Sequence, residues 1–273
     1  MTGAFSTRML AFAGGFALLF AWELVARRRR FELPRAWRWS HNVGLHATGA
    51  LVLTALSAFG PLLAFQFAFY AETQGWGLLH QTRWPYPLKF AIAILALDLV
   101  VFLQHWLFHK VPWLWRFHRV HHLDLELDLT TGLRFHPGEI LLSLAIKLAA
   151  ISLIGAHFLA VIVFEVLLNF FSMFTHANAR VPLERLLRLV FVTPEMHRVH
   201  HSVRPGETNS NYGFQLSLWD RLLGTYEPEP ADGHLDMKLG LPEQREPREQ
   251  SLPRLLLLPF LGFSSAAMAE PRR

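Results

Sequence analysis

The chain has 273 residues, of which 52% are hydrophobic and 17% are charged, and its formal net charge is +5 at pH 7. Soluble domains carry about 25% charged residues, so this composition argues against an ordinary soluble protein. Because the chain has no cysteine, disulfides, thiolate zinc sites, iron–sulfur clusters and a cysteine nucleophile are excluded. The basic residues flank apolar blocks, which indicates contact with anionic lipid headgroups and not with nucleic acid.

Apolar blocks of membrane-spanning length follow one another along the chain, since a spanning helix needs about 20 mostly apolar residues. They cover residues 9–26, 43–71, 88–108 and 140–174. The first block is followed by Arg27–Arg30 and has no basic cluster before it, so we expect a retained anchor and not a signal peptide. The second block could break at Gly60-Pro61. The fourth is too long for one helix and is expected to form a hairpin that divides near Gly155.

The basic connectors predict the orientation of these helices. The connector 27–42 holds six arginines, whereas the connector 72–87 holds only Arg83. The positive-inside rule therefore puts the first connector in the cytoplasm, in a bacterial inner membrane. We expect an all-α integral membrane protein with four to five membrane-embedded helices and a cytoplasmic helical cap.

Three regions are predicted: membrane anchor helices at 1–87, a catalytic domain at 88–226 and a C-terminal tail at 227–273. The part of the tail from 227 to 250 is rich in Pro, Glu, Asp and Arg and is typical of a solvated segment. The apolar part from 252 to 268 contains Pro253 and Pro259, so we expect it to lie on or pack against the surface.

Histidines cluster in four places within the predicted catalytic domain. These are an HxxxH (His105, His109), an HxxHH (His118, His121, His122), a single His176, and a second HxxHH (His197, His200, His201). Residues three and four apart share a helix face, so each cluster is expected to aim its imidazoles in one direction. The 15 histidines of the chain would produce an HxxHH by chance only about 0.05 times, yet two occur.

Imidazole is a ligand of iron, copper, zinc and nickel, and buried imidazoles without partners would be costly. Nine candidate ligands exceed what one ion takes, so the sequence predicts a di-metal site in the cytoplasmic cap. Two other classes also use histidines in membranes: a haem protein with bis-histidine ligation, and a non-catalytic metal-binding or transport protein.

The order and spacing of these boxes resemble the fatty acid hydroxylase superfamily, also called the sterol desaturase family. The resemblance covers residues 98–226 and includes the connecting phrases 131–139, 174–178 and 211–226, which are similar to the bacterial and alkylglycerol monooxygenase-like branch. One departure is Arg180, which stands four residues after His176, where some members have a further histidine.

The resemblance implies a membrane oxidoreductase that uses two iron ions and O₂ to hydroxylate or desaturate a C–H bond of a lipid. The substrate would be a sterol, a fatty acyl chain or an ether lipid, a choice that the sequence leaves open. Two electrons per turnover would come from a separate ferredoxin, cytochrome b5-like protein or NAD(P)H reductase. Beyond the metal ligands, the resemblance implies no catalytic residue, and Arg116, Arg119 and Arg198 would lie near phosphate headgroups.

Several other residues are candidates for a tenth ligand or for supporting roles. His136 begins a His-Pro turn at a place where sterol-type relatives also have one, and Asn178 could hold a metal-bound water or position His176. Acidic and amide side chains inside spans are costly, so Asp98, Glu165 and Asn169 are candidates for orienting the histidines. The isolated histidines are expected not to be ligands; they are His41, His46, His80 and His234.

Overall fold

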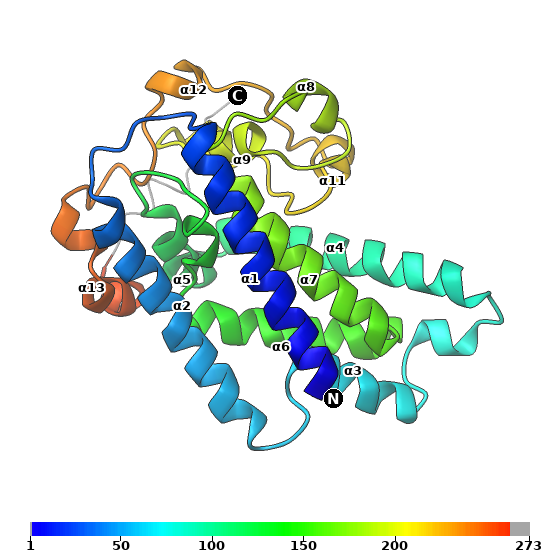
Figure 1. Ribbon diagram of the computed structural model, residues 1–273. Helices are drawn as coiled ribbons and strands as arrows, with labels where there is room; N and C mark the ends of the chain where they lie inside the picture. Colours follow the sequence, from blue (N-terminus) through cyan, green and yellow to red (C-terminus); the bar gives the residue numbers. More distant parts are fainter. Residues whose placement is uncertain (1, 263–273) are drawn as a thin grey trace.

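The computed structural model describes residues 2–262 and consists of a bundle of long helices under a cap of short ones (Figure 1). The long helices are α1 (Thr2–Val25), α2 (Arg35–Ser57), α4 (Tyr86–Lys110), α6 (Pro137–Ile154) and α7 (Phe158–His176). Between them lie α3 (Ala64–Thr73), α5 (Pro112–His122) and the 3₁₀ turns η1 (Leu78–Gln81) and η2 (Thr131–Leu133). Within 2–262 extended pairing is limited to isolated bridges, so the predicted all-α fold is confirmed.

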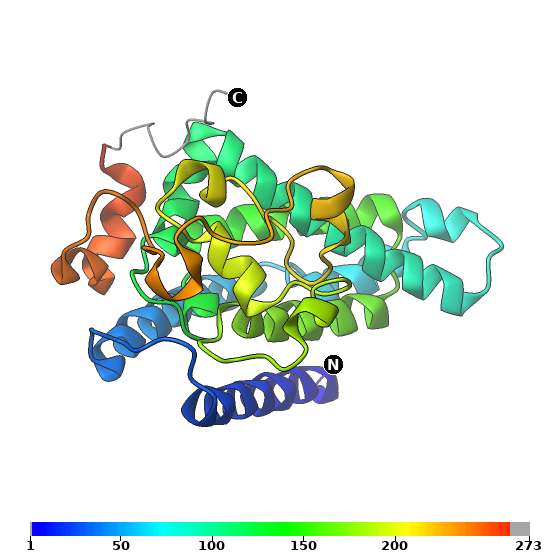
Figure 2. The same ribbon diagram turned by 90° about the horizontal axis from the view of Figure 1, so that it is seen from above.

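The cap and the C-terminal segment contain only short elements. They are α8 (Glu184–Leu187), α9 (Pro194–His200), α10 (Pro205–Thr208), α11 (Leu218–Leu222), α12 (Gly233–Asp236), η3 (Pro247–Gln250), α13 (Leu252–Leu257) and η4 (Leu258–Phe260). Seen from above, the C-terminal segment crosses over the cap end of the bundle, while α1 lies along one side (Figure 2).

Proline and glycine fix where the helices that carry the site begin and end. Pro112, Pro137 and Pro194 occupy the first turns of α5, α6 and α9, where a missing N–H costs nothing. Helix α6 stops at Gly155, whose φ of 73° is left-handed and whose N–H donates to the Ile151 carbonyl at 2.9 Å. The predicted division of the fourth apolar block is therefore confirmed.

Within residues 2–262, four helices are long and apolar enough to cross a membrane. Their spans are Ser6–Val25, Tyr86–Lys110, Pro137–Ile154 and Phe158–His176. The second apolar block breaks between α2 and α3, at the predicted Gly60-Pro61, and neither part is among these spans. Leucines on the outer faces, such as Leu10 and Leu153, are exposed, as expected for surfaces that meet lipid.

Helix α7 is the element around which the others pack, contacting α1, α3, α4, α9 and η2. Small and branched side chains such as Ala93, Ile151 and Ala160 form the core between these helices. The buried carboxylate of Glu23, on α1, accepts hydrogen bonds from the backbone N–H groups of Leu129 and Asn178, each at 2.8 Å. One acidic side chain of α1 thus holds both the loop between α5 and η2 and the segment that follows α7.

The C-terminal segment is packed more tightly than its composition predicts. Met237, Leu239 and Leu241 are buried, and the Arg134 guanidinium donates to the Gln250 side-chain oxygen at 2.7 Å. The prediction of a solvated segment at 227–250 is therefore wrong for these positions, because sparse apolar residues in a polar stretch are enough to anchor it. Leu255 of α13 is fully buried, so the following apolar part packs on the bundle, while 263–268 lies outside the described residues.

Gly132 allows η2 to lie directly on α7. A Cβ added at this glycine would stand 2.2 Å from the Ser172 carbonyl oxygen, while Ser172 Oγ donates to the Gly132 carbonyl at 2.7 Å. We therefore expect Gly132→Ala to lower the free energy of unfolding by about 1–3 kcal/mol through overpacking. Thermal unfolding of the purified protein in detergent measures the loss.

Gly14→Ala is the matched control, because a Cβ at Gly14, in the middle of α1, meets nothing within 4 Å. Alanine favours the helix over glycine by about 0.5–1 kcal/mol, so this variant should be neutral or slightly stabilised. A Gly132→Ala protein as stable as the Gly14→Ala protein would contradict the close packing of η2 on α7.

Candidate metal centre

The nine clustered histidines converge in the interior of the protein, at the cap end of the bundle. Each is at most 3% exposed, and together they form two groups whose ligand atoms lie within 4.8 Å of one another. The first group contains His105, His109, His118, His122 and His200, and the second contains His121, His176, His197 and His201. No other histidine of the described chain belongs to either group.

The first group combines helices α4, α5 and α9. His109 Nε2 lies 3.1 Å from His122 Nε2, and His200 Nε2 lies 3.0 Å from His105 Nε2. His118 directs Nδ1 away from the group, and its buried Nε2 has no hydrogen-bond partner. Nitrogen atoms at this spacing can both reach one ion at about 2.1 Å, a normal metal–imidazole distance.

The second group is centred on His176, at the C-terminal end of α7. Its Nε2 lies 3.0 Å from Nε2 of His121 and 3.1 Å from Nε2 of His197 and of His201. Arg180 stands where some members of the family have a further histidine; it is exposed, and its backbone N–H donates to the Ala26 carbonyl. The second group therefore receives no ligand from this position and has four histidines.

Each HxxHH box is divided between the two groups, contrary to the expectation that it would aim in one direction. His118 and His122 belong to the first group and His121 to the second, whereas His200 is separated from its neighbours in the other box. At 3.6 residues per turn, residues i and i+4 differ by about 40° around the axis, while i+3 lies about 60° to the other side. Helices α5 and α9 therefore each present imidazoles to both groups.

Backbone and side-chain acceptors orient several of these rings. His105 Nδ1 donates to the Tyr212 carbonyl at 2.7 Å, and His200 Nδ1 donates to the Ser210 carbonyl at 2.6 Å. His176 Nδ1 contacts the Ser172 carbonyl at 2.5 Å in the same way. A ring that donates from Nδ1 keeps Nε2 unprotonated, which is the form that binds a metal.

Burial keeps the cap histidines neutral. Desolvation, together with the neighbouring imidazoles, lowers the pKa of His121, His122 and His200 well below the usual range. Burial also lowers the pKa of His118 to about 3. Neutral nitrogen donors in two buried groups fit two ions of a metal that prefers imidazole, such as iron.

Glu139 is a residue of this centre that the sequence reasoning missed. Its Oε1 accepts a 2.7 Å hydrogen bond from His118 Nδ1, and its side chain is buried in the first turn of α6. A carboxylate behind a metal-binding imidazole fixes the ring and makes it a better ligand. An acidic residue in the first turn of a mostly apolar helix is the sequence feature that could have identified Glu139.

Asp220 holds the loop that supplies the Tyr212 carbonyl. Its two carboxylate oxygens accept from the backbone N–H groups of Tyr212 and Gly213, each at 2.8 Å, and from the Thr225 hydroxyl. The segment after the last box is thereby fixed against His105.

Asn178 and His136 lie outside both groups and have other partners. The Asn178 side chain bonds the backbone N–H and carbonyl of Arg29, both at 2.8 Å, and so holds the connector after α1. His136 caps α6: its Nδ1 accepts from Gly138 N, and its Nε2 donates to the Leu256 carbonyl. Both ring nitrogens of His136 are thus in use.

The acidic and amide candidates within the spans also lie away from the two groups. Asp98 accepts from the Trp219 indole at 2.8 Å and so joins α4 to α11. Glu165 pairs with Lys147 at 3.0 Å and with Arg8 at 2.8 Å, and Asn169 lines a cavity.

Two of the three arginines expected at the headgroups are buried. Arg119 donates to the carbonyls of Leu258 and Leu261, and Arg198 is 1% exposed. Only Arg116 of the three is exposed, so the expected place at the headgroups is wrong for Arg119 and Arg198.

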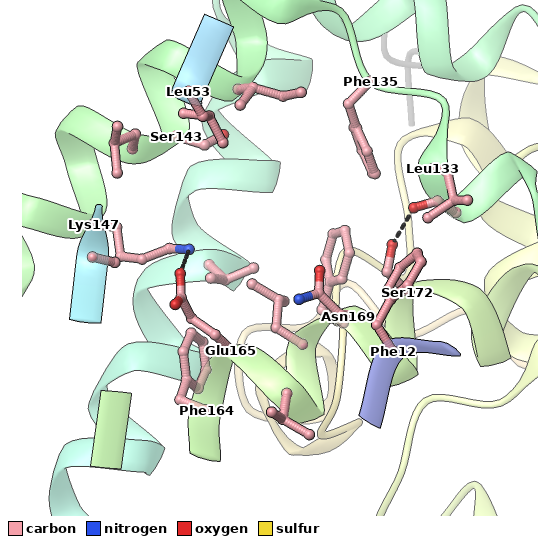
Figure 3. A pocket seen from close by; sticks show the side chains of 18 of the residues that line it. Phe12, Leu53, Leu133, Phe135, Ser143, Lys147, Phe164, Glu165, Asn169 and Ser172 are labelled. Atoms are coloured by element: carbon pink, nitrogen blue, oxygen red, sulfur yellow. Dashed lines mark hydrogen bonds and ion pairs between the residues drawn. The ribbon is translucent and has the colours of Figure 1, made fainter. Parts of the chain in front are cut away.

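An apolar cavity of about 530 Å³ leads from the first histidine group into the bundle. His105 and His118 line it, together with aromatic side chains such as Phe108 and Phe135. Figure 3 shows Leu133, Phe135 and Ser172 on one side of the cavity and Lys147 with Glu165 on the other. Such a cavity suits a ligand that is mostly hydrocarbon and that reaches the imidazoles at one end.

Comparison with known proteins agrees with this arrangement. Ornithine lipid hydroxylase from Rhizobium tropici is 32% identical over 57% of this chain and 46% of its own length. Alkylglycerol monooxygenase from Xenopus tropicalis is 30% identical over 72% of this chain and 45% of its own, and human cholesterol 25-hydroxylase is 30% identical over 48% of each. The chain thus spans less than half the length of these curated relatives. No solved structure matches it significantly.

The family model described as fatty acid hydroxylase matches residues 90–225, a range that contains all nine convergent histidines and Glu139. The chain belongs to the fatty acid hydroxylase family.

Proposed function

We propose that this protein is an O₂-dependent, non-haem di-iron enzyme that hydroxylates a membrane lipid. The observation that carries the proposal is that His105 and His118 of the first histidine group line an apolar cavity. The second group lies next to the first, with the ring centroids of His122 and His201 4.4 Å apart. The names of the relatives, all lipid hydroxylases or monooxygenases, support the same class of reaction.

In this proposal the first group would hold one iron and the second group the other. Two iron ions bound there would supply, with O₂ and two electrons, the oxidising power to attack an unactivated C–H bond. The protein's own contribution is to hold the imidazoles neutral, to exclude water through apolar walls, and to align the hydrocarbon against His105 and His118. The electrons would come from a separate donor protein.

The spacing of the nitrogens favours this reading over a bis-histidine haem protein. A haem separates its two axial nitrogens by the whole porphyrin plane, whereas the nitrogens here lie 3.0–3.1 Å apart. A transporter would carry ligands along a path through the membrane, and all nine of these histidines lie together at the cap end of the bundle.

The reaction class is tested with isotopically labelled O₂. The purified, iron-loaded protein would be reduced by a ferredoxin and its reductase in the presence of extracted membrane lipids. We expect a lipid product that has gained one labelled oxygen atom. A desaturated product without label would mean that the reaction is desaturation and not hydroxylation. If no O₂ were consumed, the protein would not be an oxygenase.

The metal assignment is tested by iron analysis of variants from the two groups. Wild-type protein should retain about two irons per chain, and His109→Ala and His121→Ala should each lose turnover and at least one iron, because each removes a ligand from a different group. His80→Ala, outside both groups and exposed, should keep both. Two irons and full turnover in either ligand variant would refute the assignment.

Glu139 gives a graded test of how the first group is held. Glu139→Leu leaves His118 Nδ1 without its acceptor, so iron affinity or turnover should fall by about 10–100-fold. Glu139→Gln keeps an oxygen that can accept and should recover part of the loss. Equal loss in both variants would mean that the charge, and not the hydrogen bond, is what matters.

We also propose that the cap faces the cytoplasm, since the connector 27–42 carries six arginines. In intact cells, Lys238→Cys in the exposed part of the cap should react only with membrane-permeant thiol reagents. Arg83→Cys, in the opposite connector, should react with impermeant ones. The reverse pattern would invert the orientation and the side from which the electron donor approaches.

A further inference from the structure

The cavity contains a cluster of charged side chains remote from the two histidine groups. Glu165 Oε2 lies 2.8 Å from Arg8 Nη2, and Glu165 Oε1 lies 3.0 Å from Lys147 Nζ. The three residues come from α7, α1 and α6, and all three line the cavity. Figure 3 shows the Lys147–Glu165 pair on the side of the cavity opposite Leu133 and Phe135.

This charged cluster, Arg8–Lys147–Glu165, carries two cations and one carboxylate. Its side chains are only 10–21% exposed, and apolar residues such as Leu97, Leu144 and Phe164 line the same cavity. Among the described lining residues the other carboxylate is Glu139, which is bonded to His118. One positive charge therefore has no counter-charge among the described lining residues, and Arg8 also stands over the Phe65 ring at 4.9 Å. In so apolar a space this excess charge favours the binding of an anion.

We propose that the Arg8–Lys147–Glu165 cluster binds the anionic group of the lipid substrate, a carboxylate or a phosphate, and so sets which carbon reaches the histidines. The inference rests on the proposed function, since it assigns the polar end of the same substrate. Arginine and lysine are the side chains that bind such groups through charge-assisted hydrogen bonds. Asn169, which lies one turn after Glu165, points into the cavity between its two sides (Figure 3).

The distance between the charged cluster and the histidine groups limits how far the reacting carbon of the substrate can lie from its anionic group. Along α7, Glu165 precedes His176 by eleven residues, and along α6, Lys147 follows Glu139 by eight, which corresponds to about 12–16 Å of helix rise. An extended chain of single bonds about 1.5 Å long advances about 1.25 Å per bond. The carbon that reaches the histidines would thus lie about ten to thirteen bonds from the anionic group.

Equilibrium binding tests the proposal without turnover. The purified full-length protein, with the metal it retains, is titrated under argon with radiolabelled dodecanoic acid, dodecyl phosphate and 1-dodecanol, with protein-free micelles subtracted. Lys147→Met and Arg8→Met should each weaken binding of the two anionic probes by at least about tenfold, since each removes a charged partner. Glu165→Gln should strengthen it, because the competing carboxylate is gone.

Dodecanol binding should change less than about threefold in all three variants, because a neutral hydroxyl gains little from an excess charge. Lys89→Met is the matched control: it lies on span α4, donates to the Thr82 carbonyl and does not line the cavity, so all three probes should bind it as they bind wild type. A preference for dodecyl phosphate or for dodecanoic acid identifies the anion as phosphate or carboxylate.

Equal effects on acid and alcohol, or unchanged binding of the anions in every variant, would overturn the proposal and leave the cluster as a contact between helices. These outcomes do not depend on catalysis. If the labelled-O₂ experiment gave no product while the variants separated anionic from neutral probes, the proposed function would fail and the anion site would stand.

Discussion

The two histidine groups depend on a protein interior that keeps nine imidazoles neutral, buried and convergent. An imidazole offers a metal only one nitrogen, and the other must be oriented by the protein. Carbonyls of Ser172, Ser210 and Tyr212 and the carboxylate of Glu139 do this for four of the rings. Much of the cap can be understood from this requirement, since Asp220 fixes the loop whose carbonyl meets His105. The short elements of the cap are held by hydrogen bonds to buried groups more than by helix length.

Helix periodicity explains why the two groups interlock. On a helix, residues four apart lie on nearly the same face, whereas a residue three further on is turned to the adjacent face. Each HxxHH box therefore contributes imidazoles to both groups. Helices α5 and α9 are therefore shared, and a shift of either would disturb both groups of imidazoles. The α7 end, which carries His176, is fixed in turn by Gly132, whose lack of a side chain lets η2 lie against the Ser172 carbonyl.

The sequence was most informative where chemistry repeats at short spacing and least informative where partners come from far along the chain. The histidine boxes, the break at Gly60-Pro61 and the turn at Gly155 are local patterns, and each predicted its local structure. The partners of Glu139 and Asn178 are side chains and backbone groups 21 and 149 residues away, so no local pattern could assign them. Its place inside an apolar span suggested that Glu165 orients a histidine, but its partners are cations on two other helices. The burial of Met237 and Leu239 likewise depends on tertiary contacts that a polar composition hides.

X-ray absorption at the iron edge of the metal-loaded protein is the most direct test of the central claim that the two histidine groups are the ligand sets of two irons. With five histidines in one group and four in the other, the spectrum should show an average of four to five imidazoles per iron. It should contain no cysteine sulfur scatterer, because the chain has no cysteine. A shell with two or fewer imidazoles per iron and mainly carboxylate oxygen would contradict the account.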